Sequence, residues 1–407
     1  MPNTNRMFFW LAMGSFVLCN LHITRNIVYI FPIVTVIFYI MTLSFLMLRN
    51  SFAKFPFVVI MSLLAIMIYS SIISFSEAPI AVLLEASGRF FFTIPFLFIG
   101  AGISKSQLRK FFIISSFFGA LGGLSLLFQF LFGPIDWFAE PSMRNGLPRY
   151  ASMLGSLTIM GTFAGIVFPL AFFTQYNTKL KYLFLTFIFV GCVLSLQKAA
   201  VMNMILFLSV VLYSKIIRRA YFQLTAFLCL GIFAAWVFNL SFGRYFASIV
   251  ENFFRFNESA SLDDFNPIEG MVMRLWQLPS ILFEQYGWNG LLFGVGLKGG
   301  AGSLGFPDSP MAHNYIFDML FIGGVPYLSL HLYLLIRTTI KTKRLAIYGD
   351  DVDVASFVSI LIFFANLIAS TGMQFQPVTS SIIYLIVGYH FLSARIQLNK
   401  VGQLHIN

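Results

Sequence analysis

The sequence predicts an all-α, polytopic membrane protein, and three observations support this fold class. The 407 residues are 58% hydrophobic and only 10% charged, whereas a soluble domain carries about 25% charged residues. Apolar runs of about 20 residues, the length that crosses the hydrocarbon core as a helix, recur along the chain. Lysine and arginine gather in every second connection between these runs, as the positive-inside rule requires. We therefore expect about 12 transmembrane helices.

The apolar runs set the order of the elements. They cover residues 7–22, 27–48, 55–75, 88–103, 111–132, 151–174, 181–196, 199–214, 221–240, 313–336, 354–375 and 378–396. The seventh and eighth runs are short and separated only by Gln197 and Lys198. A tight hairpin that crosses the membrane only in part is the alternative for this pair. Residues 78–87 are expected to form a surface helix before the fourth span, and residues 1–407 a single transmembrane domain.

Charge assigns the connections to the two sides of the membrane. With both termini cytoplasmic, the cytoplasmic connections hold 17 Lys and Arg against three acids, and the outer connections hold nine against twelve. This division accounts for the net charge of +11 without a nucleic-acid partner. The pattern predicts a multi-pass inner-membrane protein, and we expect its chemistry on the non-cytoplasmic face.

Two outer connections are longer than the rest, Gly133–Tyr150 and residues 241–312. The second contains the amphipathic stretch Ile268–Tyr286, and its residues Trp276 and Trp288 suit the headgroup level of a membrane. Long loops in compact proteins are usually functional. We expect residues 241–312 to form a large helical periplasmic loop that carries part of the active site.

The outer side is selectively rich in arginine. Seven of its nine basic residues are Arg, whereas Lys and Arg are about equal on the cytoplasmic side. Arginine grips phosphate oxygens through a planar fork, which suits a lipid diphosphate at the membrane surface. The candidates for this role are Arg144, Arg149, Arg244, Arg255 and Arg274, with Arg274 and Arg144 foremost. Pairing with outer acids or with lipid headgroups is the alternative for each of them.

His313 and Asn314 open the tenth span at the outer interface. Histidine titrates near neutral pH and can take a proton from an alcohol. His313 is therefore the candidate general base, with Glu269 and Asp308 as reserve acid/base residues. A helix-capping or interfacial histidine is the alternative interpretation.

Two short motifs are interpreted structurally. Gly294–Gly299 spells G-x-G-x-x-G, but it lies in an outer loop and not in the βαβ unit that a dinucleotide site needs. We interpret its glycines as a turn that brings the backbone close to substrate or lipid. Asp351-Val352-Asp353 resembles the metal-binding acid pair of nucleotide-sugar glycosyltransferases, and we interpret it as a solvated acid cluster at a helix start. We therefore expect no metal and no cofactor.

Ionisable residues inside the spans are scarce. The main examples are Glu85 and Arg89 near the fourth span and Asp318 in the tenth. Ion-coupled transporters usually place such groups at mid-membrane, so their scarcity counts against transport. Gly161 and Gly165, four residues apart, and the small residues of 119–123 are interpreted as helix-packing surfaces.

Several of these segments occur in an order that is characteristic of one family. They are Arg144-Asn145-Gly146 followed by Gly155, then Arg274-Leu275-Trp276, then Leu292-Phe293-Gly294-Val295-Gly296, then His313-Asn314-Tyr315-Ile316 with Leu320 and Gly324. In this order they resemble the bacterial O-antigen polymerase and O-antigen ligase superfamily. The resemblance covers roughly residues 140–336 by motif and the rest by topology.

The resemblance implies a GT-C-like fold and a metal-independent transferase. Its donor would be a glycan on undecaprenyl diphosphate, and its acceptor a sugar hydroxyl at the periplasmic face. The implied residues are Arg274 and His313 for catalysis, and Arg144, Arg149, Arg255, Lys198 and Asn314 for binding of diphosphate and substrate. Membrane lipids are expected partners, and a chain-length regulator protein is a candidate partner.

Three functions remain open at this point, and an O-antigen polymerase ranks first. A ligase that passes the glycan to lipid A–core ranks second, because ligases of this kind have Ser-Arg-Gly-Ala where this chain has Ser195-Leu196-Gln197-Lys198-Ala199. Lys198 keeps the charge there but lacks the bidentate fork. A polysaccharide or lipid transporter ranks third.

Overall fold

The protein is described by a computed structural model that divides into two compact units. The described residues are 6, 9–10, 12–17, 30–47, 54–75, 78–136, 138, 140–144, 147–155, 157, 159–174, 177–195, 197–213, 278–297, 315–348, 350–369 and 376–392. Unit 1 comprises Met1–Phe112 and Ser280–Asn407, and unit 2 comprises Ile113–Pro279. The expectation of one transmembrane domain for the whole chain stays a prediction.

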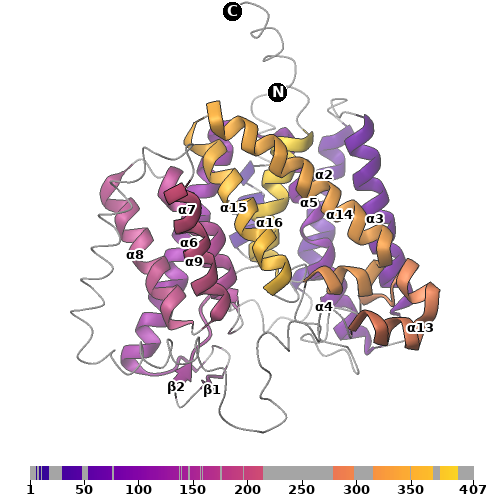
Figure 1. The fold of residues 1–407 in the computed structure, drawn as a ribbon, viewed down its shortest axis with the longest axis horizontal. Helices are drawn as coiled ribbons and strands as arrows, with labels where there is room; N and C mark the ends of the chain where they lie inside the picture. Colours follow the sequence, from indigo (N-terminus) through magenta and orange to yellow (C-terminus); the bar gives the residue numbers. More distant parts are fainter. Residues whose placement is uncertain are drawn as a thin grey trace, which may run out of the picture. The chain divides into compact units, whose positions relative to one another are not determined.

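All regular secondary structure in the described part of unit 1 is helical (Figure 1). Its elements are α2 (Ile30–Met47), α3 (Lys54–Ile73), α4 (Ile80–Phe91), α5 (Ile94–Gly102), the start of α6 (Lys105–Phe132), most of α13 (Leu278–Phe293), α14 (Tyr315–Tyr348), α15 (Asp351–Ala369), α16 (Pro377–Val387) and the π-helical turn η7 (Gly388–Leu392). Helix α5 packs against α16 and η7 at Gly100 and Gly388. A Cβ on Gly100 would lie 2.8 Å from the backbone nitrogen of Tyr389. The two backbones can meet this closely only because neither position carries a side chain.

The described part of unit 2 contains helices and one short β-hairpin. Its elements are the rest of α6, strands β1 (Ser142–Arg144) and β2 (Leu147–Arg149), and helices α7 (Ile159–Thr174), α8 (Thr178–Leu194) and α9 (Lys198–Tyr213). The strands pair antiparallel. Apart from this hairpin the described chain is helical, so the all-α fold class is confirmed in its coarse form.

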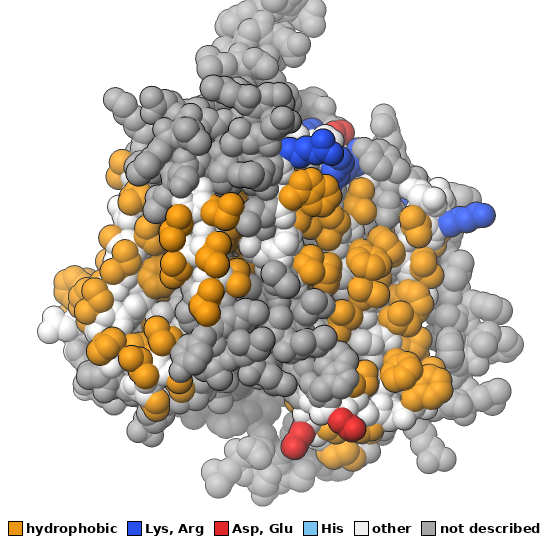
Figure 2. Space-filling view, turned by 180° about the vertical axis from the view of Figure 1, so that it is seen from behind, with side chains coloured by type: hydrophobic (Ala, Val, Ile, Leu, Met, Phe, Trp, Pro, Cys, Tyr) orange, Lys and Arg blue, Asp and Glu red, His pale blue; other side chains and the backbone are white. Residues whose placement is uncertain are grey.

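Three helical segments within the described residues are long and apolar enough to cross a membrane. They are Ile80–Gly102, Lys105–Phe132 and Ile316–Ile347, and shorter apolar helices accompany them. Helix α6 has 28 residues, which gives a length of about 42 Å. On the face shown in Figure 2, hydrophobic side chains dominate the described surface between charged groups at its two ends. The chain is therefore a membrane protein by composition and helix length, while the count of twelve spans and the GT-C-like fold stay predictions.

The predicted spans agree with the helices in order but not at every boundary. Helix α6 starts six residues before the predicted 111, because Ser104 and Gln107 form a capping box in which each side chain accepts the backbone N–H of the other. Helix α4 runs through residue 88, so the expected border between a surface helix and the fourth span is wrong. Helix α7 starts at Ile159 and not at 151, because residues 151–155 form a turn.

The predicted helix-packing glycines of unit 2 are confirmed. A Cβ on Gly165 would lie 2.6 Å from atoms of the Asn203 side chain of α9. The Asn203 amide in turn donates to the carbonyl of Gly161 at 3.4 Å. Gly123 of α6 likewise lies against the backbone of Phe187 in α8. These small residues let the backbones of α6 and α8 meet and let the Asn203 side chain of α9 pack directly on α7.

Candidate functional site

Most predicted site residues lie outside the described part of the chain. These are Arg244, Arg255, Glu269, Arg274, Asp308, His313 and Asn314, and most of the loop 241–312 lies there with them. Arg144 and Lys198 are described through their backbone, as the last residue of β1 and the first residue of α9. Arg149 is described with its side chain. The elements that carry or flank these residues define the geometry of the candidate site.

The four residues after α13, Gly294–Leu297, form a turn that lies directly against α14 in unit 1. We call it the Gly294 turn. In it, the Val295 N–H donates to Phe321 O, and the following N–H donates to Ile322 O at 3.2 Å. Both carbonyls precede a break in α14 at Gly323–Gly324, where the backbone leaves helical geometry. A helix that breaks leaves its last carbonyls without intrahelical donors, and the Gly294 turn supplies those donors.

Glycine is required on both sides of this contact. Gly294 has φ 74° and Gly324 has φ 69°, a region that side-chain-bearing residues rarely occupy. A Cβ on Gly294 would lie 2.6 Å from the backbone nitrogen of Gly323, and a Cβ on Gly324 would collide with Leu292 O. The predicted turn is therefore present, but the backbone that it approaches is that of α14. The interpretation that it approaches substrate or lipid is wrong for Gly294.

This contact places two parts of the family-like motif in one structural piece. The outer piece of α14, Tyr315–Ile322, extends about 10 Å from its first residue to the break. His313 precedes Tyr315 by two residues, which is at most about 7 Å of chain. The connection 298–314 therefore starts on the Gly294 turn and ends on the helix piece to which that turn is hydrogen-bonded.

A separate group of predicted site residues belongs to unit 2, around Arg149 at the end of β2. Its Nε donates to Ser195 O at 3.1 Å, and its Nη2 donates to Leu157 O at 3.1 Å. Arg149 is half-buried and its fork engages two backbone carbonyls. It thereby joins the hairpin to the turn between α8 and α9, which differs from the predicted role of a diphosphate ligand.

Gln197 extends the same network. Its Nε2 donates at 2.7 Å to Leu157 O, the carbonyl that Arg149 also contacts. The Gln197 side chain lies over Gly161 of α7, where any Cβ would collide with it. The turn that precedes Lys198 is thus held by α7 on one side and by the hairpin on the other.

Arg144, Arg149 and Lys198 are brought to neighbouring segments by this network. The register pairs Ser142 with Arg149 and Arg144 with Leu147. Because alternate residues of a strand share a face, positions 144 and 149 lie on the same face of the hairpin. Lys198 occupies the N-terminus of α9, the end at which a helix carries partial positive charge. Positions 144 and 198 can therefore favour an anionic group, while Arg149 contacts backbone carbonyls.

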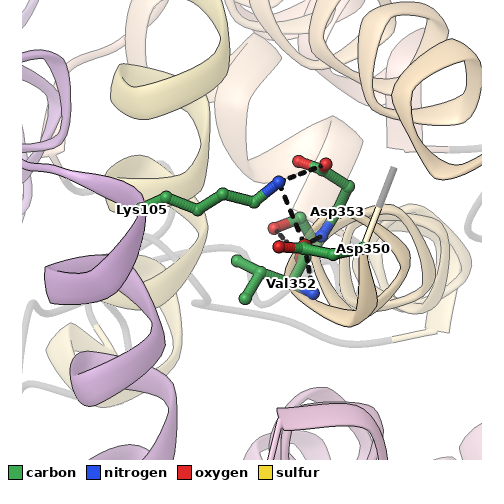
Figure 3. A network of polar contacts seen from close by, with 5 residues as sticks. Lys105, Asp350, Val352 and Asp353 are labelled. Atoms are coloured by element: carbon green, nitrogen blue, oxygen red, sulfur yellow. Dashed lines mark hydrogen bonds and ion pairs between the residues drawn. The ribbon is translucent and has the colours of Figure 1, made fainter. Parts of the chain in front are cut away.

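The acid cluster at the start of α15 has a structural role (Figure 3). The Asp350 carboxylate accepts the backbone N–H of Val352 at 2.9 Å, which caps the helix. Lys105 Nζ lies 2.7 Å from Asp353 Oδ2 and 3.0 Å from Asp350 Oδ1. The predicted helix start is confirmed, but Asp353 is only 3% exposed, so its predicted solvation is wrong. The Lys105 ammonium beside it offsets the cost of burying this carboxylate.

Unit 1 also buries ionisable groups that sequence reasoning overlooked. His331 of α14 and His390 of η7 are fully buried, and His331 Nδ1 lies 3.1 Å from Tyr384 Oη. Glu85 and Arg89, which were singled out, form an ion pair within α4, and Asp318 is completely buried. His331 and His390 each stand alone in an apolar run. Neither has a second polar residue at a motif spacing, so the sequence gives no signal for a site there.

Two further features were missed, and one of them had a signal. Asn145-Gly146 between β1 and β2 is the dipeptide most typical of a two-residue hairpin loop, and it predicts these strands. Ser70 in the last turn of α3 contacts the α14 break, and Ser74, the residue after α3, contacts the Gly294 turn. No sequence pattern distinguishes them from other serines in apolar helices.

Comparison with known proteins adds no relative. No protein-family model matches the chain, and no curated protein does.

Proposed function

We propose that this protein is an O-antigen polymerase of the bacterial inner membrane. It transfers a glycan from undecaprenyl diphosphate to the sugar hydroxyl of another lipid-linked repeat unit at the periplasmic face. The observation that carries the proposal is the docking of the Gly294 turn on the α14 break. It unites two of the ordered family-like segments, and His313 precedes by two residues the helix piece that the turn contacts.

The chemistry asks two things of the protein. The diphosphate leaving group needs positive charge where negative charge develops, and the acceptor hydroxyl needs a base. Arg274 and Arg144 supply the charge, with Lys198, Arg255 and Asn314 as further ligands. His313 takes the proton, with Glu269 and Asp308 in reserve. Arg149 acts by holding the α8–α9 turn, because its fork already contacts two backbone carbonyls.

Complementation read on a lipopolysaccharide gel tests the proposal. In a strain that makes this protein's own repeat unit but lacks its gene, the wild-type chain should convert single-repeat molecules into a long ladder. His313→Ala, at a normal level in the membrane, should lose that ladder, whereas His405→Ala near the C-terminus should keep it. A full ladder from His313→Ala would remove His313 from the role of base.

A ligase is separated by the same gel in a different strain. In a ligase-deficient strain, attachment of any O-antigen to the lipid A–core by this protein would identify a ligase and overturn the polymerase proposal. The lysine at position 198, in place of the arginine of ligase-like members, favours the polymerase.

A polysaccharide or lipid transporter, the third-ranked function, is favoured by one observation. His331, His390 and Asp318 are buried in apolar helices, the kind of group that lines ion or substrate pathways. For a transporter, Arg274→Ala would leave glycan polymerisation intact and block translocation. Loss of polymerisation with translocation intact supports the transferase.

A further inference from the structure

Two serines at the C-terminal end of α3 meet the junction between the Gly294 turn and α14. The Ser70 hydroxyl lies 2.9 Å from Ile322 O, the carbonyl just before the α14 break. The Ser74 hydroxyl accepts the backbone N–H of Leu297 at 2.7 Å and donates to Ser70 O at 2.8 Å. Both serines are 0% exposed. The end of α3 and the residue after it therefore contact both the Gly294 turn and the α14 break.

The serine contacts add to the hydrogen bonds that the Gly294 turn makes with α14. Ile322 O also accepts the Gly296 N–H at 3.2 Å, so two different segments converge on one carbonyl that α14 cannot satisfy. Gly296 has no side chain at the point where it lies against Ser74, and a Cβ there would collide with the hydroxyl. The hydroxyl and the missing side chain thus fit each other.

We propose that Ser70 and Ser74 are positioning residues for the His313–Asn314 segment. By joining α3 to the Gly294 turn and to the α14 break, they fix the outer piece Tyr315–Ile322 against the rest of unit 1. His313 and Asn314 directly precede that piece in the sequence, so the piece fixes the point at which this segment joins the helix. This inference rests on the proposed function, because it concerns the residue that acts as the base.

The chain contains a matched control on the same helix. Ser71 is half-buried, and its hydroxyl donates to Met67 O within α3 itself. Ser71→Ala removes one serine hydroxyl from the same turn of helix without touching the junction. Ser70→Ala provides a second test should Ser74→Ala fail to fold.

The experiment uses the full chain in lipid nanodiscs, with amide hydrogen exchange followed by mass spectrometry. In Ser74→Ala, exchange at Leu297 should accelerate at least tenfold, because that amide loses its acceptor. In Ser70→Ala the carbonyl of Ile322 loses the Ser70 hydroxyl. Amide exchange around the α14 break, from Ile322 to Gly324, should therefore rise. Exchange equal to that of Ser71→Ala in both variants would overturn the proposal.

Turnover and histidine reactivity test the link to His313. With the lipid-linked repeat unit, Ser74→Ala should lower kcat at least tenfold per folded molecule and leave KM within twofold. Faster exchange with unchanged kcat would show a structural contact only and overturn the positioning role. If the wild-type chain turns over no lipid-linked glycan, the proposed function fails on its own. The rate of His313 modification by diethyl pyrocarbonate then decides, since positioning requires that it differ between Ser74→Ala and Ser71→Ala.

Discussion

At the scale of single residues, Arg149 shows how one side chain can organise a region. Its guanidinium donates to Ser195 O and Leu157 O, and Gln197 donates to the second of these carbonyls. Three chain segments are therefore joined through two acceptors. An arginine that binds phosphate and one that binds backbone carbonyls use the same planar fork, which is why sequence alone assigned Arg149 to the diphosphate.

Replacing Arg149 with lysine should reduce stability. A lysine keeps the charge but cannot direct donors to both carbonyls, and two charge-assisted hydrogen bonds on a half-buried group contribute on the order of 1–2 kcal/mol after screening. We expect a lower thermal midpoint for Arg149→Lys in detergent, while Arg337→Lys on the exposed side of α14 leaves it unchanged. An unaltered midpoint combined with weaker inhibition by inorganic diphosphate would return Arg149 to the diphosphate site.

At the scale of elements, α14 is the most informative helix. Gly323 and Gly324 divide it into an outer piece and a longer inner piece that also contains Pro326. The Gly294 turn lies on this division and satisfies the carbonyls that it exposes. A broken helix in an apolar protein is tolerated where neighbouring segments satisfy the freed backbone groups.

Two glycines of α13 and its turn allow a controlled test of this packing. Gly287 and Gly294 both have positive φ, but a Cβ on Gly287 meets nothing within 4 Å, whereas one on Gly294 meets the backbone of α14. Both Gly→Ala changes carry the cost of positive φ, roughly 1–3 kcal/mol. Gly294→Ala adds a steric cost of about 1–3 kcal/mol. We therefore expect a lower thermal midpoint and a shorter ladder for Gly294→Ala than for Gly287→Ala. Equal midpoints for the two variants would show that the close contact is dispensable.

At the scale of the whole molecule, contacts within each unit agree with the sides assigned from charge. The pairs are Ser74 with Leu297 and Arg149 with Ser195, both at outer positions, and Lys105 with Asp353, both at cytoplasmic positions. Charged groups stay on their own side of a bilayer because crossing it is costly. Two residues lie on the same side of the membrane only if an even number of spans separates them. An odd number would have placed the members of a contacting pair on opposite sides of the membrane.

Labelling of single cysteines can check this topology. In a chain with Cys19, Cys192 and Cys229 replaced, Glu140→Cys lies in the predicted outer loop and Lys343→Cys in a predicted cytoplasmic one; both native side chains are exposed. A membrane-impermeant maleimide should label Glu140→Cys in intact spheroplasts, and Lys343→Cys only after permeabilisation. The reverse order of labelling would contradict the assignment of sides.

Sequence reasoning could predict what is encoded locally. Apolar length located the helices, the capping box at Ser104 would have given the true start of α6, and Asn145-Gly146 would have given the hairpin. It could not predict partners that are distant along the chain. From its sequence neighbours alone, Asp353 is interpreted as a solvated acid, because its partner Lys105 is 248 residues away along the chain. The role of Ser70 likewise depends on Ile322, which is 252 residues away along the chain.

The contact of Ser70 with Ile322 also constrains how the chain is made. These residues are 252 positions apart, which at 5–20 residues per second separates their synthesis by about 10–50 s. During that interval the Ser70 hydroxyl has an acceptor in its own helix, since Ile66 O lies 2.9 Å away. Helix α3 can therefore form during synthesis with the Ser70 hydroxyl already hydrogen-bonded. Once α14 has been synthesised, the same hydroxyl can donate its proton to Ile322 O.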